Sequence, residues 1–168
     1  MSWERRISIQ QCTERSVARR IPELELRLGV RFPQTYKASI SEAEGCRPLS
    51  PCFAISKPQS QRAITDVEDI GVELDVEEID TFLLVSEDRG ELGDVYSVDS
   101  WLARISKLQP GAVPFAIDLA DNPLCFDYRN GEAEPKIVYL DMEREGADAL
   151  WFVADSFSSL LENLLDVE

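Results

Sequence analysis

The sequence predicts one α+β domain, in which N-terminal helices and a C-terminal amphipathic helix pack on a mainly antiparallel sheet. Helical patterns fill the first third of the chain, short apolar runs separated by turn residues follow, and an apolar helical stripe ends it. A length of 168 residues with 44% hydrophobic residues suits one domain with a core. We find no repeat or low-complexity linker, and we predict a single domain over residues 21–168 after a polar, basic lead-in over 1–20.

The first helix is predicted from a proline and a glycine at its two ends. The lead-in carries five arginines on a polar stretch that is compatible with partial helix. Pro22 suits the first position of a helix, so we expect the first clear helix to begin near Ile21. Gly29 suits the position just after a helix, and the predicted helix stops there.

A second helix is predicted between Pro33 and Gly45, for the same reasons. Residues 46–58 contain three prolines and two cysteines and are predicted to form a loop, with a short strand at 53–55. A third short helix is predicted over residues 61–70.

After residue 80 the hydrophobic pattern changes to that of strands. The run Thr81–Ser86 predicts a buried strand, and Asp94–Val98 predicts the second strand of a hairpin, across a turn with two glycines. Residues 101–108 fit either a helix or an irregular segment. Three further apolar runs predict an antiparallel meander, namely Val113–Ile117, Leu124–Tyr128 and Ile137–Leu140.

The last predicted element is an amphipathic helix after Asp155 or Ser156, either of which suits an N-cap. Its apolar stripe follows helical spacing and consists of Phe157, Leu160, Leu161, Leu164 and Leu165. We expect this stripe to lie on the sheet, where each fully buried side chain contributes roughly 1.5–3 kcal/mol. Trp151 and Phe152, just before this helix, are predicted to be core residues or staple residues rather than a ligand cage.

Charge is unevenly divided along the chain. The net charge is −15, from 17 basic and 32 acidic residues. Residues 1–65 hold 11 basic and 6 acidic residues, net +5, and residues 66–168 hold 6 and 26, net −20. Such a charge repels phosphate backbones and anionic lipids, so we expect no direct binding to nucleic acid and no membrane association. The acidic residues either coat solvated faces or form a surface for a basic protein partner.

Histidine is absent from the sequence, which removes Ser-His and Cys-His nucleophile pairs and histidine-containing zinc sites. Asp118, Asp121 and Asp127 could together hold a divalent cation, but their spacing does not fit a calcium loop, and we assign them turn or surface roles. A carboxylate-dependent hydrolase is a further alternative, because its two acids need no fixed spacing. We expect no enzyme activity, no cofactor and no metal.

The four cysteines lack the two-residue spacing of a zinc knuckle or redox motif. The first 20 residues have no apolar stretch of the kind found in export signals, and no apolar run is long enough to span a membrane. We therefore expect reduced thiols in a cytoplasmic protein, with Cys125 in the core.

Several sequence segments, taken in their order along the chain, resemble those of the SUKH superfamily. The segment at 21–46 has the family's leucine-glycine helix end, its proline-initiated helix with a tyrosine and its following glycine, and residues 93–94 match the glycine-acid step of its central hairpin. The stronger match covers residues 113–146 and 153–165. Its matching positions are Pro114 and Phe115, Asn122, Phe126 to Tyr128, Pro135 to Tyr139, and Ser156 with Phe157.

The chain departs from the family pattern in two loops. Members often have a glycine-rich turn at Leu119 to Asp121 and a histidine between the acids at Asp141 and Glu143. The resemblance implies a non-enzymatic α+β protein-binding domain. Bacterial members are similar to immunity proteins that neutralise a toxin, often a nuclease, and a fungal relative regulates cell-wall synthesis through protein contacts.

We therefore expect an acidic immunity-type protein that binds a basic toxin stoichiometrically. The candidate partner-binding residues lie in two acidic loops: Glu87, Asp88, Glu91 and Asp94 in the first, and Asp118, Asp121 and Asn122 in the second. The alternative is a regulatory or scaffold protein that binds an endogenous protein. The sequence leaves the oligomeric state open.

Overall fold

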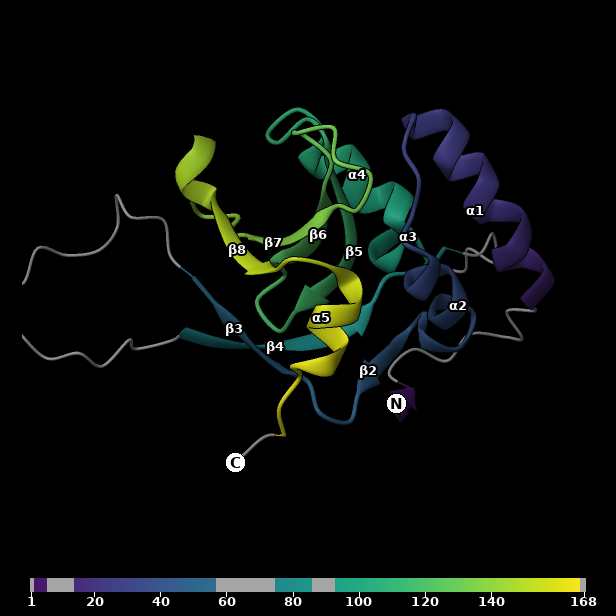
Figure 1. Cartoon of the computed structure of the whole chain (residues 1–168), viewed down its shortest axis with the longest axis horizontal. Helices are drawn as coiled ribbons and strands as arrows, with labels where there is room; N and C mark the ends of the chain where they lie inside the picture. The colour runs from purple at the N-terminus through teal and green to yellow at the C-terminus, as the bar shows by residue number, and fades with distance from the viewer. Residues whose placement is uncertain (1, 6–13, 57–74, 86–92, 167–168) are drawn as a thin grey trace, which may run out of the picture.

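Six strands form one antiparallel sheet, and helices cover it (Figure 1). The computed structural model describes residues 2–5, 14–56, 75–85 and 93–166. The elements are β1 (Trp3–Arg5), α1 (Glu14–Leu28), α2 (Gln34–Ala43), β2 (Cys46–Pro48), β3 (Cys52–Ile55), β4 (Asp75–Phe82), α3 (Gly93–Tyr96), α4 (Val98–Ile105), β5 (Ala112–Asp118), β6 (Pro123–Asp127), β7 (Lys136–Leu140), the 3-10 helix η2 (Gly146–Ala149), β8 (Leu150–Ala154) and α5 (Phe157–Glu162).

The strands follow the order β3-β4-β5-β6-β7-β8, and every neighbouring pair is antiparallel. This confirms the predicted α+β class, and β5, β6 and β7 confirm the predicted meander. The sheet curls until its two edge strands meet, because the Ser56 backbone N–H, just after β3, donates to the Phe152 carbonyl of β8 over 2.9 Å. β1 and β2 form a separate two-stranded sheet.

Every residue of β5 and β6 is buried, because both faces of these central strands are covered. An aromatic cluster joins the sheet to two helices and consists of Tyr36 of α2, Phe115 of β5, Phe126 of β6 and Phe157 of α5. The ring centroids of Phe115 and Phe126 lie 4.5 Å apart, and those of Tyr36 and Phe126 lie 5.0 Å apart. α4 packs against β5 and buries Trp101. Cys125 is fully buried, as predicted.

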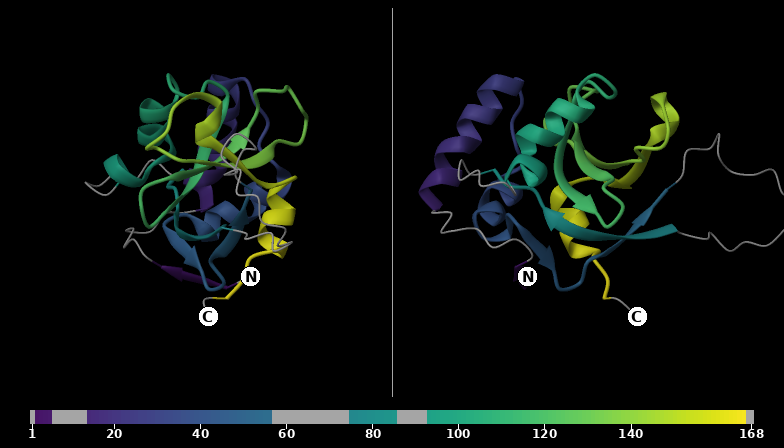
Figure 2. Two further views of the ribbon diagram at one scale, coloured as in Figure 1. Left: turned by 90° about the vertical axis from the view of Figure 1, so that its left-hand side faces the viewer. Right: turned by 180° about the vertical axis from the view of Figure 1, so that it is seen from behind.

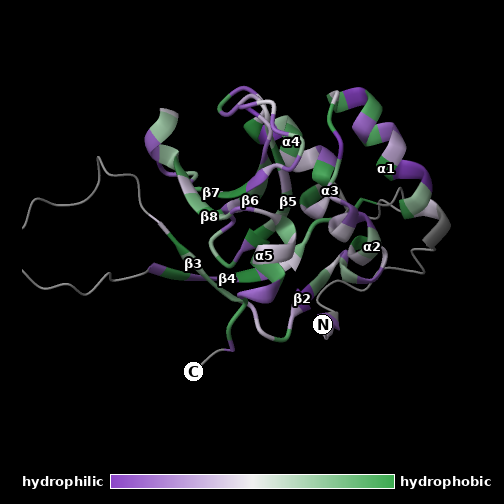
Figure 3. Cartoon of the chain, in the orientation of Figure 1, coloured by the Kyte–Doolittle hydropathy of each residue, from purple (hydrophilic) through white to green (hydrophobic). Residues whose placement is uncertain are grey.

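α1 begins at Glu14, well before the predicted start near Ile21, and Pro22 lies inside it. The helix tolerates the hydrogen bond lost at the proline because Val17, Ile21 and Leu24 bury one of its sides. Hydrophilic and hydrophobic residues alternate along α1 (Figure 3). It stands at one side of the molecule, next to α4 and away from β8 (Figure 2).

α2 begins after Pro33, as predicted. The region expected to be a loop with one strand contains two strands, β2 and β3. β4 begins at Asp75 and ends at Phe82, so the predicted strand at Thr81–Ser86 overlaps only its end. The predicted helix at 61–70 lies outside the described residues.

The predicted strand at Asp94–Val98 is wrong, because the chain forms α3 and α4 there. Ser97 is the N-cap of α4, and its hydroxyl accepts a hydrogen bond from the Ser100 backbone N–H over 3.2 Å. Val98, Trp101 and Ile105 then follow helical spacing on the buried side. Alternation over only five residues does not distinguish a strand from the start of a helix.

The end of the chain differs from the prediction in two ways. Trp151 and Phe152 belong to the strand β8, and Phe152 is exposed rather than in the core. Ser156 does cap α5, as predicted, but this helix ends at Glu162. Leu165 lies beyond the helix and instead exchanges two backbone hydrogen bonds with Cys52 of β3, at 2.9 and 3.0 Å.

Candidate functional site

The hairpin of β5 and β6 places two candidate sites at its opposite ends. At one end Ile117 pairs with Pro123 and the Asp118–Asn122 turn follows. At the other end Ala112 pairs with Asp127. β5 spans seven residues, so about 20 Å of strand separates the two ends.

The Asp118 carboxylate organises the turn at the first end. Its Oδ1 accepts from the backbone N–H groups of Ala120, at 2.8 Å, and Asn122, at 2.7 Å. Its Oδ2 accepts from the Tyr139 hydroxyl, at 2.7 Å, and from Asn122 Nδ2, at 3.3 Å. Burial and then this bond to Asp118 raise the pKa of Tyr139. The turn is therefore held by one carboxylate with four donors.

Burial corrects the expectation that Asp118 presents its carboxylate to a partner, because this residue is 3% exposed. Asp121 is exposed and has a positive φ of 61°. Asn122 is half-buried, and its Oδ1 accepts from the Met142 backbone N–H over 2.9 Å. Of the three predicted residues in this turn, Asp118 and Asn122 fix its shape and Asp121 faces solvent.

The other predicted loop falls largely outside the described residues, which exclude Glu87, Asp88 and Glu91. Asp94 lies in α3, where a strand was expected, and its side chain is likewise outside the described part of the chain. The role of these four residues stays a prediction.

Further carboxylates surround the Asp118 turn. Burial, followed by the negative charges of Asp118, Asp75, Asp141 and Glu78, raises the pKa of Glu77 on β4. These residues come from β4, the end of β5 and the end of β7, so the tertiary structure brings them together. Arg144 pairs with Asp141 over 3.0 Å.

We call this region the acidic end and define it as Asp75, Glu77, Asp118, Asp121 and Asp141. Sequence reasoning missed Asp75, Glu77 and Asp141. The sequence contains no local signal for them, because they approach the turn only through the pairing of β4 with β5 and the Asn122 contact.

Asp127 lies away from the acidic end, so the three aspartates considered for a cation are not brought together. Hydrogen bonds from Arg129 Nε and Nη2, both at 2.8 Å, lower the pKa of Asp127, and burial opposes this effect only in part. Within the described ranges, no group of three or more His, Cys, Asp or Glu residues could hold a metal ion.

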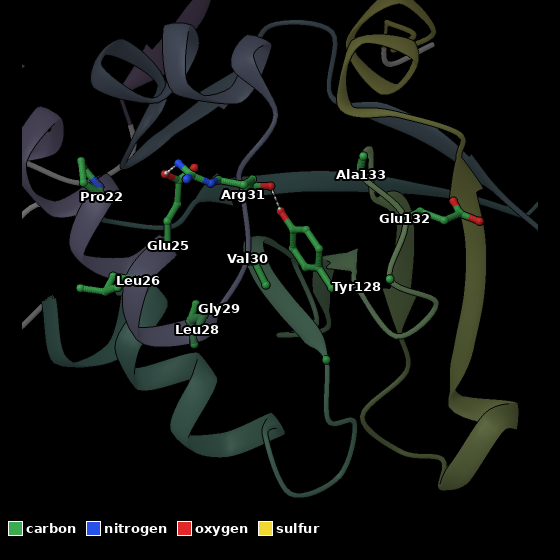
Figure 4. A pocket seen from close by; sticks show the side chains of 12 residues that line it. Pro22, Glu25, Leu26, Leu28, Gly29, Val30, Arg31, Tyr128, Glu132 and Ala133 are labelled. Atoms are coloured by element: carbon green, nitrogen blue, oxygen red, sulfur yellow. Dashed lines mark hydrogen bonds and ion pairs between the residues drawn. The ribbon is translucent and has the colours of Figure 1, made fainter.

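A groove of about 710 Å³, which we call the α1 groove, lies at the other end of the hairpin, between the end of α1 and the loop after β6 (Figure 4). Glu25 lies at this groove and is buried; its Oε1 accepts from the Phe32 backbone N–H, at 2.8 Å, and from Lys37 Nζ, at 2.9 Å. Across the groove the Tyr128 hydroxyl donates to the Arg31 carbonyl over 2.6 Å. These bonds fix both walls of the groove.

Comparison with protein families decides what kind of domain this is. The model of the SMI1 / KNR4 family (SUKH-1) matches residues 18–163, most of the chain. The chain belongs to the SMI1/KNR4 (SUKH-1) family. This confirms the resemblance to the SUKH superfamily. No curated protein and no solved structure matches the chain.

SUKH domains typically act through protein interactions, so the surfaces of this SUKH-1 chain are considered as candidate protein-binding surfaces. The acidic end and the α1 groove are its two candidate surfaces. Among the helices that the structure describes, none is both long and apolar enough to cross a membrane.

Proposed function

We propose that this SUKH-1 protein is a non-enzymatic immunity protein that neutralises a basic, nuclease-type toxin by stoichiometric binding in the cytoplasm. One observation carries the proposal: the acidic end is negative and held rigid by internal hydrogen bonds. A nuclease needs positive charge to hold phosphates, so a negative surface complements it and raises the rate of association.

Rigidity supports a binding role because a preformed surface loses little conformational entropy on association. The Asp118 carboxylate holds the turn that exposes Leu119 and Asp121, and Asn122 ties this turn to the loop at Met142. An exposed apolar side chain beside exposed acids suits a basic surface with an apolar recess.

The absence of catalysis is also part of the proposal. Two buried carboxylates serve structure: Asp118 accepts four hydrogen bonds, and Asp127 is paired with Arg129. The sequence offers no histidine as a general base. A cytoplasmic location is supported by the three described cysteines, none of which forms a disulfide with another.

The test starts with a salt-eluted pull-down from the native host, and any captured protein is then purified and assayed as a nuclease with and without the SUKH-1 chain. We expect a basic nuclease that one equivalent of the chain inhibits. Recovery of an endogenous, non-toxic partner would replace this proposal with the alternative, a regulatory or scaffold protein related to cell-wall synthesis regulators.

A matched pair of double charge reversals then locates the interface. D121K with E143K changes two exposed acids at or beside the acidic end, and D155K with E162K changes two exposed acids elsewhere. We expect the first pair to raise the Kd for the toxin by about tenfold or more and the second to have a much smaller effect. Equal effects of the two pairs would contradict binding at the acidic end.

A further inference from the structure

The α1 groove combines a recess and a projection, both apolar. Leu28, Val30 and Tyr128 contribute apolar surface to its lining. Leu26 lies at its rim and is 86% exposed, which is the most exposed large apolar side chain among the described residues. It points away from Tyr128 in Figure 4, toward solvent. A single exposed leucine is common on protein surfaces, but here Leu26 adjoins the apolar lining of the groove, and contiguous apolar patches often mark protein interfaces.

The two walls of this groove carry opposite charges. On the α1 wall the Arg31 side chain is 86% exposed and lies 3.7 Å from Glu25. Arg27 does not line the groove and pairs with Asp99 of α4. On the opposite wall Glu132 is exposed, in the loop between β6 and β7 (Figure 4). Arg31 therefore lies on one side of the apolar lining, and Glu132 lies at the outer edge of the other side, with its carboxylate pointing away from Tyr128 (Figure 4).

We propose that this groove binds a second copy of the same chain and forms a symmetric dimer. A two-fold axis at the groove places Leu26 of each copy at the recess of the other. The same axis brings Arg31 of one copy to Glu132 of the second copy, and the reverse pair forms at the same time. A surface that carries both a projection and its recess, and both signs of charge, complements itself under two-fold symmetry.

Net charge favours this face over the others for self-association. Two copies at −15 repel each other, and acidic residues predominate after residue 65. Residues 14–31, which form α1 and its end, hold five arginines against three glutamates. Contact at α1 therefore avoids bringing the acidic end of one copy against that of the other, and leaves both acidic ends free for a partner.

The first test measures the dimer dissociation constant of the full chain by sedimentation equilibrium, for the wild type, L26D and L119D. Leu119 is 65% exposed and lies at the opposite end of β5, so L119D is the control. We expect a wild-type dimer that L26D weakens about tenfold or more and L119D leaves unchanged. Circular dichroism verifies that each variant is folded. A wild-type chain that is monomeric at millimolar concentration overturns the proposal.

The second test exchanges charges across the interface. R31E and E132R each create like-charge pairs in the homodimer, and we expect each to weaken it about tenfold or more. The double variant R31E/E132R restores both opposite-charge pairs and is expected to dimerise like the wild type. An equimolar mixture of R31E and E132R is expected to form a heterodimer. Failure of both the double variant and the mixture to recover dimerisation, with all chains folded, overturns the pairing of Arg31 with Glu132.

Discussion

The hydroxyl group of Tyr139 donates a hydrogen bond of 2.7 Å to the buried carboxylate of Asp118. Tyr139 lies on β7 and Asp118 ends β5, so this bond crosses over β6 and joins two strands that are not neighbours. This bond anchors the Asp118–Asn122 turn of the acidic end to β7.

We predict that Y139F lowers the free energy of unfolding by about 1–3 kcal/mol, because it removes a donor from a buried carboxylate. Y128F is the comparison, since it removes a hydroxyl that donates to the Arg31 carbonyl and is predicted to cost about 1 kcal/mol or less. Urea unfolding followed by circular dichroism measures both. Equal losses in the two variants would contradict the structural role of the Tyr139–Asp118 bond.

A second prediction concerns the backbone of Asp121, whose φ of 61° is unfavourable for a β-branched residue. We expect D121V to lower the free energy of unfolding by about 1–2 kcal/mol and D121G to leave it within about 0.5 kcal/mol of the wild type. Both variants remove the same charge. A lower melting temperature of D121V than of D121G therefore does not come from the lost charge and reports on the strained backbone, because the greater freedom of glycine in the unfolded chain acts in the opposite direction. Similar melting temperatures would contradict this account.

The pKa of Glu77 predicts a pH-dependent gain in stability from E77Q. Burial and the surrounding acids raise this pKa in the folded protein. The folded chain thus binds more protons than the unfolded chain between the two pKa values, and the contribution of Glu77 to stability falls as pH rises through that window. We expect E77Q to be more stable than the wild type at pH 7 and to lose this advantage below about pH 4. Urea midpoints measured across this range are the test; an advantage independent of pH would contradict the cause.

Asp127 is predicted to show the opposite dependence. Hydrogen bonds from Arg129 lower its pKa on folding, so the unfolded chain binds more protons between the two pKa values and stability rises with pH there. We expect D127N to be less stable than the wild type at pH 7 and the difference to shrink as pH falls below about 4. R129Q should reproduce the loss at pH 7, because it removes the same bonds. A loss in D127N that stays constant down to pH 2 would contradict the prediction.

The candidate site was only partly predictable from the sequence. The Asp118–Asn122 segment was identified as an acidic turn, because aspartate, asparagine and proline together are typical of turns. The burial of Asp118 could not be predicted from the sequence, since its carboxylate is bound by Tyr139, a residue 21 positions later in the chain. Glu77 was also missed, because it reaches the turn only when β4 pairs with β5.

The fold divides in a similar way. Within the sequence, local patterns determined the meander of β5, β6 and β7, the start of α2 after Pro33 and the cap at Ser156, because each depends on a few neighbouring residues. Only the tertiary structure decided the conformation of the residues that follow α5 and the way in which the two edges of the sheet pair. Leu165 lies outside the helix because its backbone forms hydrogen bonds with Cys52 of β3, and such bonds between distant segments compete with local helix formation. The two edges of the sheet meet where Ser56 pairs with Phe152, which are far apart in the sequence.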